Sequence, residues 1–404
     1  MSDVIFMGKL LDGVSVKWSA LGEVGEFVRG KRFVKADIIS NGVPCIHYGE
    51  MYTHFGVSAR EAISFLDAEL ASKLRLASHG DVIIVAAGET IEDIGNGTAW
   101  VGESDVVIHD ACFAFKSKLN PVYVSYFLRT KSFKEQVKKY ISSGKISSIN
   151  SNGLAKASIP IPCPEDPEKS LEIQAEIVRI LDSFTELTAE LTAELTAELT
   201  ARKKQYNYYR DQLLSFEDDE AEWKTLVSLV DINTGSKPPE ILESATSFDY
   251  INAGTSRSGY AAASNCAGDA VTTPSRGQGG IGYVGYQSKP FWLGPLCYKL
   301  QSTDLTILIN KYLFYFLQSR NEMLLGLKKE GGVPAINKSD LVQLEIPVPS
   351  LEEQKRIVAI LDKFDALTNS ITEGLPREIE LRQKQYAYYR DLLLAFPKPA
   401  GVET

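Results

Sequence analysis

The stretch Gln174-Ala-Glu-Ile-Val-Arg-Ile-Leu-Asp182 decides the fold, because it returns later in the chain as Gln354-Lys-Arg-Ile-Val-Ala-Ile-Leu-Asp362. A second pair, Tyr206-Asn-Tyr-Tyr-Arg-Asp211 and Tyr386-Ala-Tyr-Tyr-Arg-Asp391, keeps the same separation of 180 residues. The two copies align without a gap, from Leu171 to Phe216 and from Leu351 to Phe396. The chain therefore contains an internal duplication.

Each copy has the apolar spacing of a long helix. The first copy alternates steps of four and three residues at Ile173, Ile177, Ile180, Phe184, Leu187 and Leu191, and the second does so at Ile357, Ile360, Phe364, Leu367 and Ile371. This spacing is typical of a coiled-coil seam. We expect two long antiparallel helices, each covering the seam of the other. The alternative is two unrelated surface helices on two globular domains.

The first helix carries three consecutive Thr-Ala-Glu-Leu units from Thr188 to Leu199. The leucines expected along this spacer helix are Leu187, just before the units, and Leu191, Leu195 and Leu199, at their ends. Each unit advances the helix by about 6 Å and turns its leucine by about 40°. The second helix has Gly374 and Pro376 opposite this region, and we expect it to kink or break there.

Two mixed domains are expected, one before each long helix. Strands are predicted over Asp81–Ala86 and Asp105–His109, and a helix over Pro121–Tyr140. The segment Ile159-Pro-Ile-Pro162, which precedes the first helix, is matched by Ile346-Pro-Val-Pro349 before the second helix. In the same way, Trp18 near the start of the first domain is matched by Trp223 near the start of the second. We predict an α+β fold in which two long helices, forming an antiparallel coiled coil, separate two pseudo-repeated α/β domains. The first domain is expected over residues 1–158 and the first helix over 159–220, followed by the second domain over 221–345 and the second helix over 346–404.

Charge and composition constrain the function. The 404 residues carry a net charge of −9, and the segment 161–222 alone carries −10. Because the other regions are nearly neutral, a basic surface on either domain is allowed. Without a long apolar run or a cleavable leader, the sequence favours a soluble cytoplasmic protein with no membrane partner. The five cysteines, free of any Cys-x-x-Cys pair, give no zinc pattern.

The search for catalytic chemistry finds no convincing motif. Gly25–Lys31 has the spacing of a phosphate loop, but Arg32 stands where a serine or threonine should bind magnesium. Gly277–Gly282 fits a dinucleotide fingerprint, but no helix follows it. The four histidines lack metal-helix spacing. We expect no active site, no metal and no cofactor bound by this chain.

Polar loops offer better candidates for reading DNA. Arg276 and Gln278 lie among glycines and could contact guanine and adenine, respectively. The aligned loop of the first domain offers Glu89, Thr90, Glu92, Asn96 and Thr98. Further candidate phosphate or base contacts are Lys31, Arg32, Lys237, Arg257 and Ser258. Solvated loops without a nucleic-acid partner remain an alternative.

With these motifs the chain resembles the specificity subunit of type I restriction-modification enzymes, and its Thr-Ala-Glu-Leu repeat resembles that of the C subfamily. The resemblance covers essentially the full length. It implies two target recognition domains, each reading half of a bipartite, asymmetric DNA site, with helices that set the spacer between the halves. Individual base-reading residues do not transfer, because these domains vary freely within the family.

The resemblance also implies partners for a chain that is itself not an enzyme. These are double-stranded DNA, two methyltransferase subunits that bind S-adenosylmethionine, and two motor and nuclease subunits that use ATP and magnesium. The complex would methylate adenine and serve bacterial defence. Two other functions remain open: a coiled-coil adaptor without direct DNA readout, and a nucleotide-dependent enzyme using Gly25–Lys31 or Gly277–Gly282.

Overall fold

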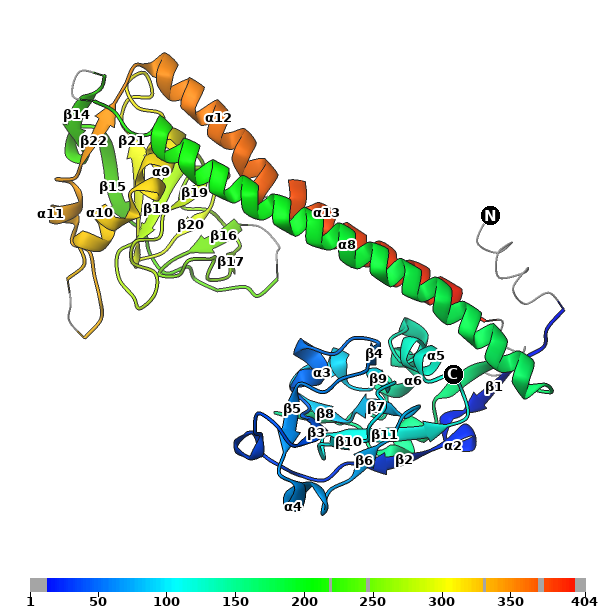
Figure 1. Cartoon of the computed structure of the whole chain (residues 1–404). Coiled ribbons are helices and arrows are strands. Elements are labelled where there is room, and N and C mark those ends of the chain that lie inside the picture. The colour runs from blue at the N-terminus through cyan, green and yellow to red at the C-terminus, as the bar shows by residue number, and fades with distance from the viewer. Residues whose placement is uncertain (1–12, 218–219, 245–247, 330–331, 370–373, 397–404) are drawn as a thin grey trace. The chain divides into compact units, whose positions relative to one another are not determined.

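The computed structural model describes residues 13–217, 220–244, 248–329, 332–369 and 374–396. The chain divides into two compact units, the first formed by Met1–Ala193 with Glu380–Thr404 and the second by Glu194–Ile379 (Figure 1). Each unit thus combines one globular domain with parts of two long helical segments. The acidic segment Glu217–Glu220 lies partly outside the described residues.

The elements of the first domain are short strands and helices. Its strands are β1 (Val16–Ala20), β2 (Gly25–Arg29), β3 (Val43–Ile46), β4 (Ser58–Ala59), β5 (Ser64–Leu66), β6 (Leu76–Ala77), β7 (Val82–Val85), β8 (Ala87–Gly88), β9 (Gly97–Trp100), β10 (Val106–Ile108), β11 (Cys112–Ser117), β12 (Ser147–Ser148) and β13 (Ser158–Pro162). Its helices are α2 (Leu21–Val24), η1 (Lys35–Asp37), α3 (Glu50–Thr53), α4 (Ala68–Ala71), η2 (Ile91–Asp93), α5 (Pro121–Phe127), α6 (Lys131–Lys138) and α7 (Ser151–Ala155).

The elements of the second domain are fewer. Its strands are β14 (Glu222–Thr225), β15 (Val230–Thr234), β16 (Phe248–Ile251), β17 (Tyr260–Ala261), β18 (Ala270–Pro274), β19 (Gly285–Gln287), β20 (Trp292–Leu293), β21 (Cys297–Ser302) and β22 (Glu345–Val348). Its helices are η3 (Leu226–Ser228), α9 (Asn310–Ser319), α10 (Asn321–Gly326) and α11 (Lys338–Leu341). The long helices are α8 (Pro167–Leu213), α12 (Leu351–Asn369) and α13 (Gly374–Leu393).

The duplication extends to the sheets. The strand order β2-β11-β7-β9 of the first domain is repeated as β15-β21-β18-β19 in the second. An antiparallel pair precedes the long helix in both: Trp18 lies opposite Pro160 in β1 and β13, and Trp223 lies opposite Pro347 in β14 and β22. The two domains are therefore copies of one plan, as the sequence predicted.

Two predictions within the domains need adjustment. The predicted strands at Asp81–Ala86 and Asp105–His109 are confirmed as β7 and β10. The single helix predicted over Pro121–Tyr140 is wrong, because α5 ends at Phe127 and α6 begins at Lys131. The Thr130 side chain caps α6 by accepting a hydrogen bond from the Phe133 N–H at 3.2 Å, which starts a new helix axis.

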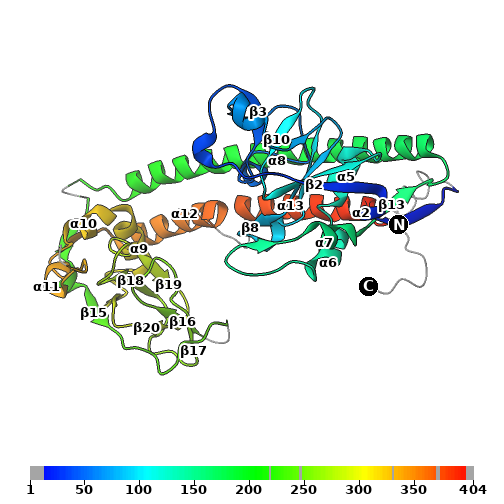
Figure 2. The same ribbon diagram turned by 90° about the horizontal axis from the view of Figure 1, so that it is seen from below.

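The long helices pair with antiparallel direction. In the first unit, Phe184 of α8 stacks on Tyr389 of α13, with ring centroids 6.1 Å apart, and the Thr185 and Tyr386 hydroxyls lie 2.9 Å apart (Figures 1 and 2). In the second unit, Tyr209 of α8 stacks on Phe364 of α12 at 6.0 Å. Since the early part of α8 meets α13 and its late part meets α12, the pairing is antiparallel. The predicted interruption is confirmed, because α12 ends at Asn369 and α13 begins at Gly374.

The predicted seam is wrong about where the first helix is most buried. Ile177, Val178 and Leu181 of α8 belong to the apolar core of the first domain and are at most 9% exposed. Phe184 and Leu187, which the seam would cover, are 38% and 52% exposed. The beginning of α8 is thus packed on its own domain, and Ile357 and Leu361 of α12 are packed in the same way on the second.

Each domain is fastened to its helix by equivalent hydrogen bonds. In the first unit, the buried Gln174 side chain accepts from the Asn120 N–H at 2.9 Å, and the Tyr126 hydroxyl donates to Asp182 at 2.7 Å. In the second unit, Gln354 accepts from the Ile309 N–H at 2.9 Å, and the Tyr315 hydroxyl donates to Asp362 at 2.6 Å. The duplicated Gln and Asp positions therefore join each domain to its helix.

Removing either tyrosine hydroxyl should loosen this junction. Tyr126→Phe and Tyr315→Phe should each lower the free energy of unfolding by about 1–3 kcal/mol, because each carboxylate loses a charge-assisted hydrogen bond. Urea denaturation followed by circular dichroism measures the change. Tyr388→Phe, at a position 62% exposed, is the control and should change little. Equal losses at all three positions would show that these hydroxyls do not fasten the domains.

Candidate DNA interface

In the first domain, the basic loop Gly30–Asp37 follows β2. The turn between β10 and β11 holds its start: the Gly30 N–H donates to Cys112 O at 3.0 Å, and a Cβ at Gly30 would lie 2.2 Å from His109 O. Gly235 follows β15 in the second domain, and a Cβ there would lie 1.9 Å from Leu293 O. Glycine is required at both positions for this close approach. The predicted Lys31 and Lys237 thus leave equivalent strands at equivalent glycines.

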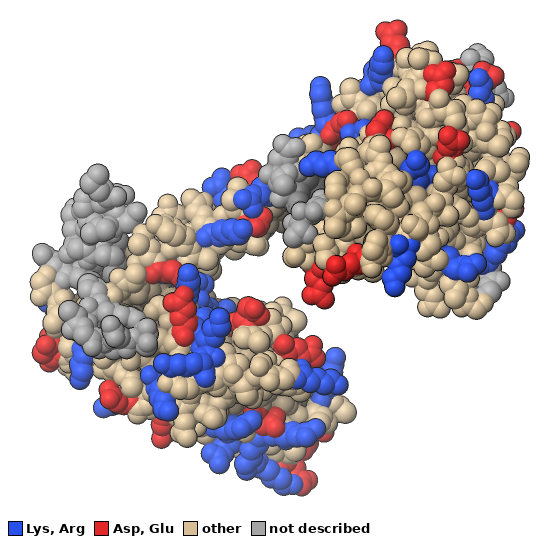
Figure 3. All heavy atoms as spheres, turned by 180° about the vertical axis from the view of Figure 1, so that it is seen from behind, with Lys and Arg blue, Asp and Glu red and all other residues tan. Residues whose placement is uncertain are grey.

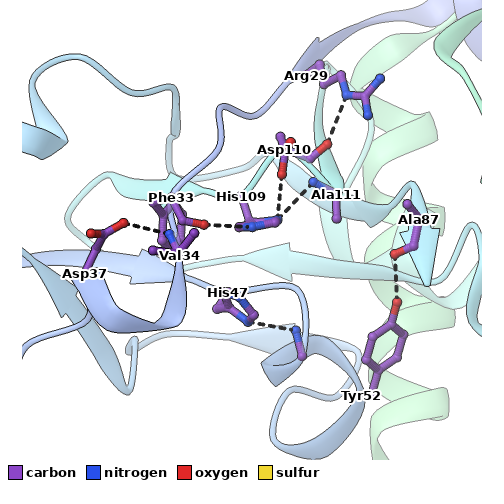
Figure 4. A network of polar contacts seen from close by, with 11 residues as sticks. Arg29, Phe33, Val34, Asp37, His47, Tyr52, Ala87, His109, Asp110 and Ala111 are labelled. Carbon is purple, nitrogen blue, oxygen red and sulfur yellow. Dashed lines mark hydrogen bonds and ion pairs between the residues drawn. The ribbon is translucent and has the colours of Figure 1, made fainter. Parts of the chain in front are cut away.

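Aromatic packing anchors the middle of the basic loop. Phe33 is buried, and its ring centroid lies 5.1 Å from that of His109 and 5.9 Å from that of His47. His109 Nε2 lies 3.0 Å from Phe33 O, and Nδ1 accepts from the Ala111 N–H at 3.1 Å (Figure 4). The neutral imidazole, protonated on Nε2, satisfies these two contacts. Nδ1 also lies 3.0 Å from an Asp110 carboxylate oxygen, which favours the protonated ring, but burial outweighs this and lowers the pKa of His109. Phe33 therefore fixes the loop while Lys31 and Arg32 remain exposed.

The turn His109–Ala111 also contacts the residues that lead into the other candidate DNA-binding loop of this domain, which runs from Gly88 to Gly97. Ala111 O accepts from the N–H groups of Ala86 and Ala87, which precede the Gly88–Gly97 loop, and the Tyr52 hydroxyl donates to Ala87 O at 3.2 Å (Figure 4). Glu89, Thr90 and Glu92 are exposed in that loop. The basic loop and this loop thus lie on two sides of one turn.

Two residues proposed for this loop are less available than expected. Thr98 is fully buried in β9 and donates to Gly56 O at 2.8 Å, so the idea that it contacts bases is wrong. Asn96 is half-buried, and its amide donates to Asp93 at 3.2 Å. Lys134 fastens the loop by donating to Glu92 O and Ile94 O at 3.0 and 2.8 Å. Glu89, Thr90 and Glu92 are the predicted side chains of this loop that remain exposed.

The second domain brings its candidates together more closely. The Gly277 N–H donates to Pro334 O at 3.0 Å, and Gly280 lies against the Ala253 carbonyl of the loop that carries Arg257 and Ser258. Arg276 and Gln278 are exposed on this loop pair. Arg257 is partly engaged already: its guanidinium lies 4.8 Å from the Tyr260 ring centroid and 3.7 Å from Asp249.

Spatial neighbours add basic residues that the sequence analysis missed. Lys31 Nζ donates to Lys73 O at 2.8 Å, which places exposed Lys73 and Arg75 beside the basic loop. Lys and Arg side chains gather on the lower part of the first unit, in the region of α4 and β6 (Figure 3). In the second domain, the Lys329 N–H donates to Ala335 O opposite Arg276. No motif marks these lysines, because only the fold brings them to the loops.

Nothing in the described ranges supports the metal or nucleotide alternatives. Gly25–Arg29 of the phosphate-loop spacing forms strand β2, and Gly277–Gly282 is an irregular loop that leads into β19. Among the described residues, no group of three or more His, Cys, Asp or Glu side chains could hold a metal ion. In the same residues, no helix is both long enough and apolar enough to cross a membrane.

The family comparison decides what this arrangement is. The model of the type I restriction modification DNA specificity domain matches residues 14–201 and again residues 219–381, one match for each half of the duplication. The chain belongs to this family. Its members are the non-catalytic, DNA-recognising subunits of their complexes, so the expectation that this chain is not an enzyme is confirmed by membership.

Relatives extend the match to the full length. The chain is 38% identical to the type I restriction enzyme EcoR124I/EcoR124II specificity subunit of Escherichia coli, with 100% of both chains covered. It is 34% identical to the EcoprrI specificity subunit of the same organism, covering 92% of this chain and 93% of the relative. A solved structure, described as the structural basis of complex assembly and conformational transition of the type I R-M system, shares the fold. Its TM-score is 0.64 at 16% identity, covering 94% of this chain and 97% of that one.

Acid should loosen the basic loop. Burial lowers the pKa of His47 and of His109, and neighbouring Glu50 and Asp110 oppose this only in part. Because the unfolded imidazoles, with pKa values of 6.5, bind protons first, the free energy of unfolding should fall as the pH drops below 6.5. The measurement is denaturation at about pH 7.5 and about pH 5.5. Between these two pH values, the free energy of unfolding should fall less in the double variant His47→Gln/His109→Gln than in the wild type or in the control His54→Gln, which changes an exposed histidine. An identical fall in all three proteins would show that His47 and His109 do not cause the acid sensitivity.

Proposed function

We propose that this chain reads a bipartite DNA site, one half with each domain, and that its helices set the distance between the halves. The observation that carries the proposal is the duplicated fastening: equivalent tyrosine–aspartate and glutamine–backbone bonds join each domain to a helix of the same antiparallel pair. A domain held in this way transmits any change in helix length to the position of its loops.

Two loop sets are proposed to contact DNA. In the first domain these are the basic loop, with Lys31 and Arg32, and the neighbouring loop with Glu89, Thr90 and Asn96. In the second domain they are Arg276 and Gln278 with Arg257, Ser258 and Lys237. Lysines suit phosphates, whereas Arg276 and Gln278 have the donor geometry for base edges. The exposure of these side chains and the glycine-bounded loops support the assignment.

The helices are further proposed to bind two methyltransferase subunits and, through them, two motor and nuclease subunits. The internal repeat supports a pair of partners, because two equivalent faces of one chain can each bind a copy of the same protein. S-adenosylmethionine, ATP and magnesium would be bound by those partners. The acidic character of the segment 161–222 suits protein contacts better than contacts with phosphates.

Selection from a random duplex pool tests the function. The chain, purified with its methyltransferase partner, should enrich two short motifs separated by a fixed number of unspecified base pairs. Enrichment of a single motif would contradict reading by two domains. No enrichment, with an intact complex, would favour the coiled-coil adaptor.

A further inference from the structure

Each domain carries a further loop that the duplication repeats. In the first domain, Ser142 and Ser148 close a hairpin through two backbone hydrogen bonds of 2.9 and 3.0 Å. In the second, Lys329 and Ala335 pair in the same way, through bonds of 2.8 and 3.3 Å. In both domains the pair ends directly before the repeated dipeptide Ile-Asn. The two pairs are therefore equivalent positions of one plan.

Strand pairing places each of these loops beside a candidate DNA-binding loop of its own domain. Ser148 of β12 lies opposite Ala87 of β8, which leads into the Gly88–Gly97 loop. Ala335 lies opposite Arg276 in the second domain. Because paired strands lie about 4.8 Å apart, side chains next to these pairs can reach the same ligand as the neighbouring loop.

Both loops expose one aliphatic side chain at the same place. Ile146, two residues before Ser148, is 62% exposed, and Val333, two residues before Ala335, is 54% exposed. The residues on either side of the two aliphatic residues differ between the copies. A single exposed aliphatic residue is ordinary on a protein surface. An equivalent pair in two domains with different neighbours indicates a shared use.

The surroundings of these side chains favour a nucleic acid as the partner. Ile146 directly follows exposed Lys145, and Val333 lies next to the strand pair that carries exposed Arg276. A protein interface needs a larger contiguous apolar area than one side chain. DNA instead combines phosphates, which attract cations, with isolated methyl groups, because the thymine C5-methyl is an apolar group at the base edges of the major groove.

We propose that Ile146 and Val333 contact thymine methyl groups in the major groove, one in each half of the site. The inference rests on the proposed function and assigns to each domain a base-contacting residue that no motif marks. Branched side chains suit this role, because their methyl groups lie close to the backbone and have few rotamers to lose. Arg276 and Gln278 on the neighbouring loop have donors for purine edges in the same groove, which admits a two-stranded hairpin.

Replacement of each thymine of the selected site by deoxyuridine, which lacks only the C5-methyl, tests the contact. Fluorescence anisotropy measures the affinity of the chain with its methyltransferase partner. At one thymine of one half-site, the wild type should bind the uracil duplex about threefold to tenfold more weakly. Ile146→Ala should already bind the thymine duplex that much more weakly and should show no further loss with uracil. Val333→Ala should behave in the same way at a thymine of the other half-site.

Two controls separate this contact from a general weakening. Ile146→Val keeps a branched side chain and should keep most of the uracil effect. Lys145→Ala changes the adjacent cation and should keep the full difference between thymine and uracil. Because Ile146 and Val333 are exposed, the melting temperatures of their alanine variants should stay near that of the wild type.

Three results would overturn the proposal: equal binding of thymine and uracil duplexes by the wild type, a full uracil effect in the alanine variants, or a selected half-site without an A·T pair. Each of them leaves the enrichment of a bipartite site unchanged, so the proposed function would stand. No enrichment in the random pool would refute the proposed function, and this inference with it.

Discussion

Leu181→Ala is expected to lower the free energy of unfolding of the first unit by about 2–5 kcal/mol. Leu181 is fully buried in the core of the first domain although it belongs to the long helix α8. Truncation removes apolar contacts and leaves a cavity between the helix and the domain, where both neighbours are already fixed by hydrogen bonds. Because the helix carries the domain, this loss should also release the domain from α8.

Leu361→Ala is the matched variant, because Leu361 is the repeat counterpart of Leu181 and is fully buried in the second unit. Leu187→Ala is the control at a position 52% exposed. Denaturation with guanidinium, followed by tryptophan fluorescence and circular dichroism, measures all three. If Leu187→Ala were as destabilising as Leu181→Ala, helix–helix packing would dominate and the originally expected seam would be the better description.

Arg276→Ala is expected to lower affinity for the selected DNA site by about 1–3 kcal/mol and to relax base preference at one position of one half-site. The reason is that an arginine paired with a guanine edge contributes discrimination, which alanine cannot replace. Lys237→Ala is the matched change on another exposed loop of the same domain. If Lys237 contacts a phosphate, its loss should weaken all sequences similarly and reduce the salt dependence.

Fluorescence anisotropy with duplexes that carry each base at each position separates these effects. The other half-site, which we propose that the first domain reads, is the internal control and should keep its preference in both variants. An Arg276→Ala protein that loses affinity equally for every sequence would mean that Arg276 contacts the backbone instead of a base.

The sequence was most informative where the duplication constrains it. Two copies of one motif predicted the long helices, their antiparallel pairing and the repeated domain plan, and Gly374 with Pro376 predicted the interruption of the second helix. These features depend on periodicity and on backbone chemistry, which are local properties. The specificity-subunit family could be identified from the same motifs.

The remaining features depend on which surfaces meet. Apolar spacing marks a buried stripe on a helix but does not say what covers it, so Ile177 was assigned to the helix pair instead of to the domain core. Thr98 looked like a loop residue, but strand pairing buries it in β9. Lys73 lies beside Lys31 only because the fold brings together residues that are far apart in the chain.

We propose that the length of the long helices sets the distance between the two half-sites. Deleting one Thr-Ala-Glu-Leu unit turns the helix by about 40°, close to the roughly 34–36° of one base pair, and shortens it by about 6 Å. Since the recognition loops must face the groove, we expect rotation to dominate. The chain with its methyltransferase partner should be titrated with duplexes that differ only in spacer length. We expect the optimal spacer of the deletion variant to be shorter by about one base pair, whereas an unchanged optimum would show that helix length does not set the spacer.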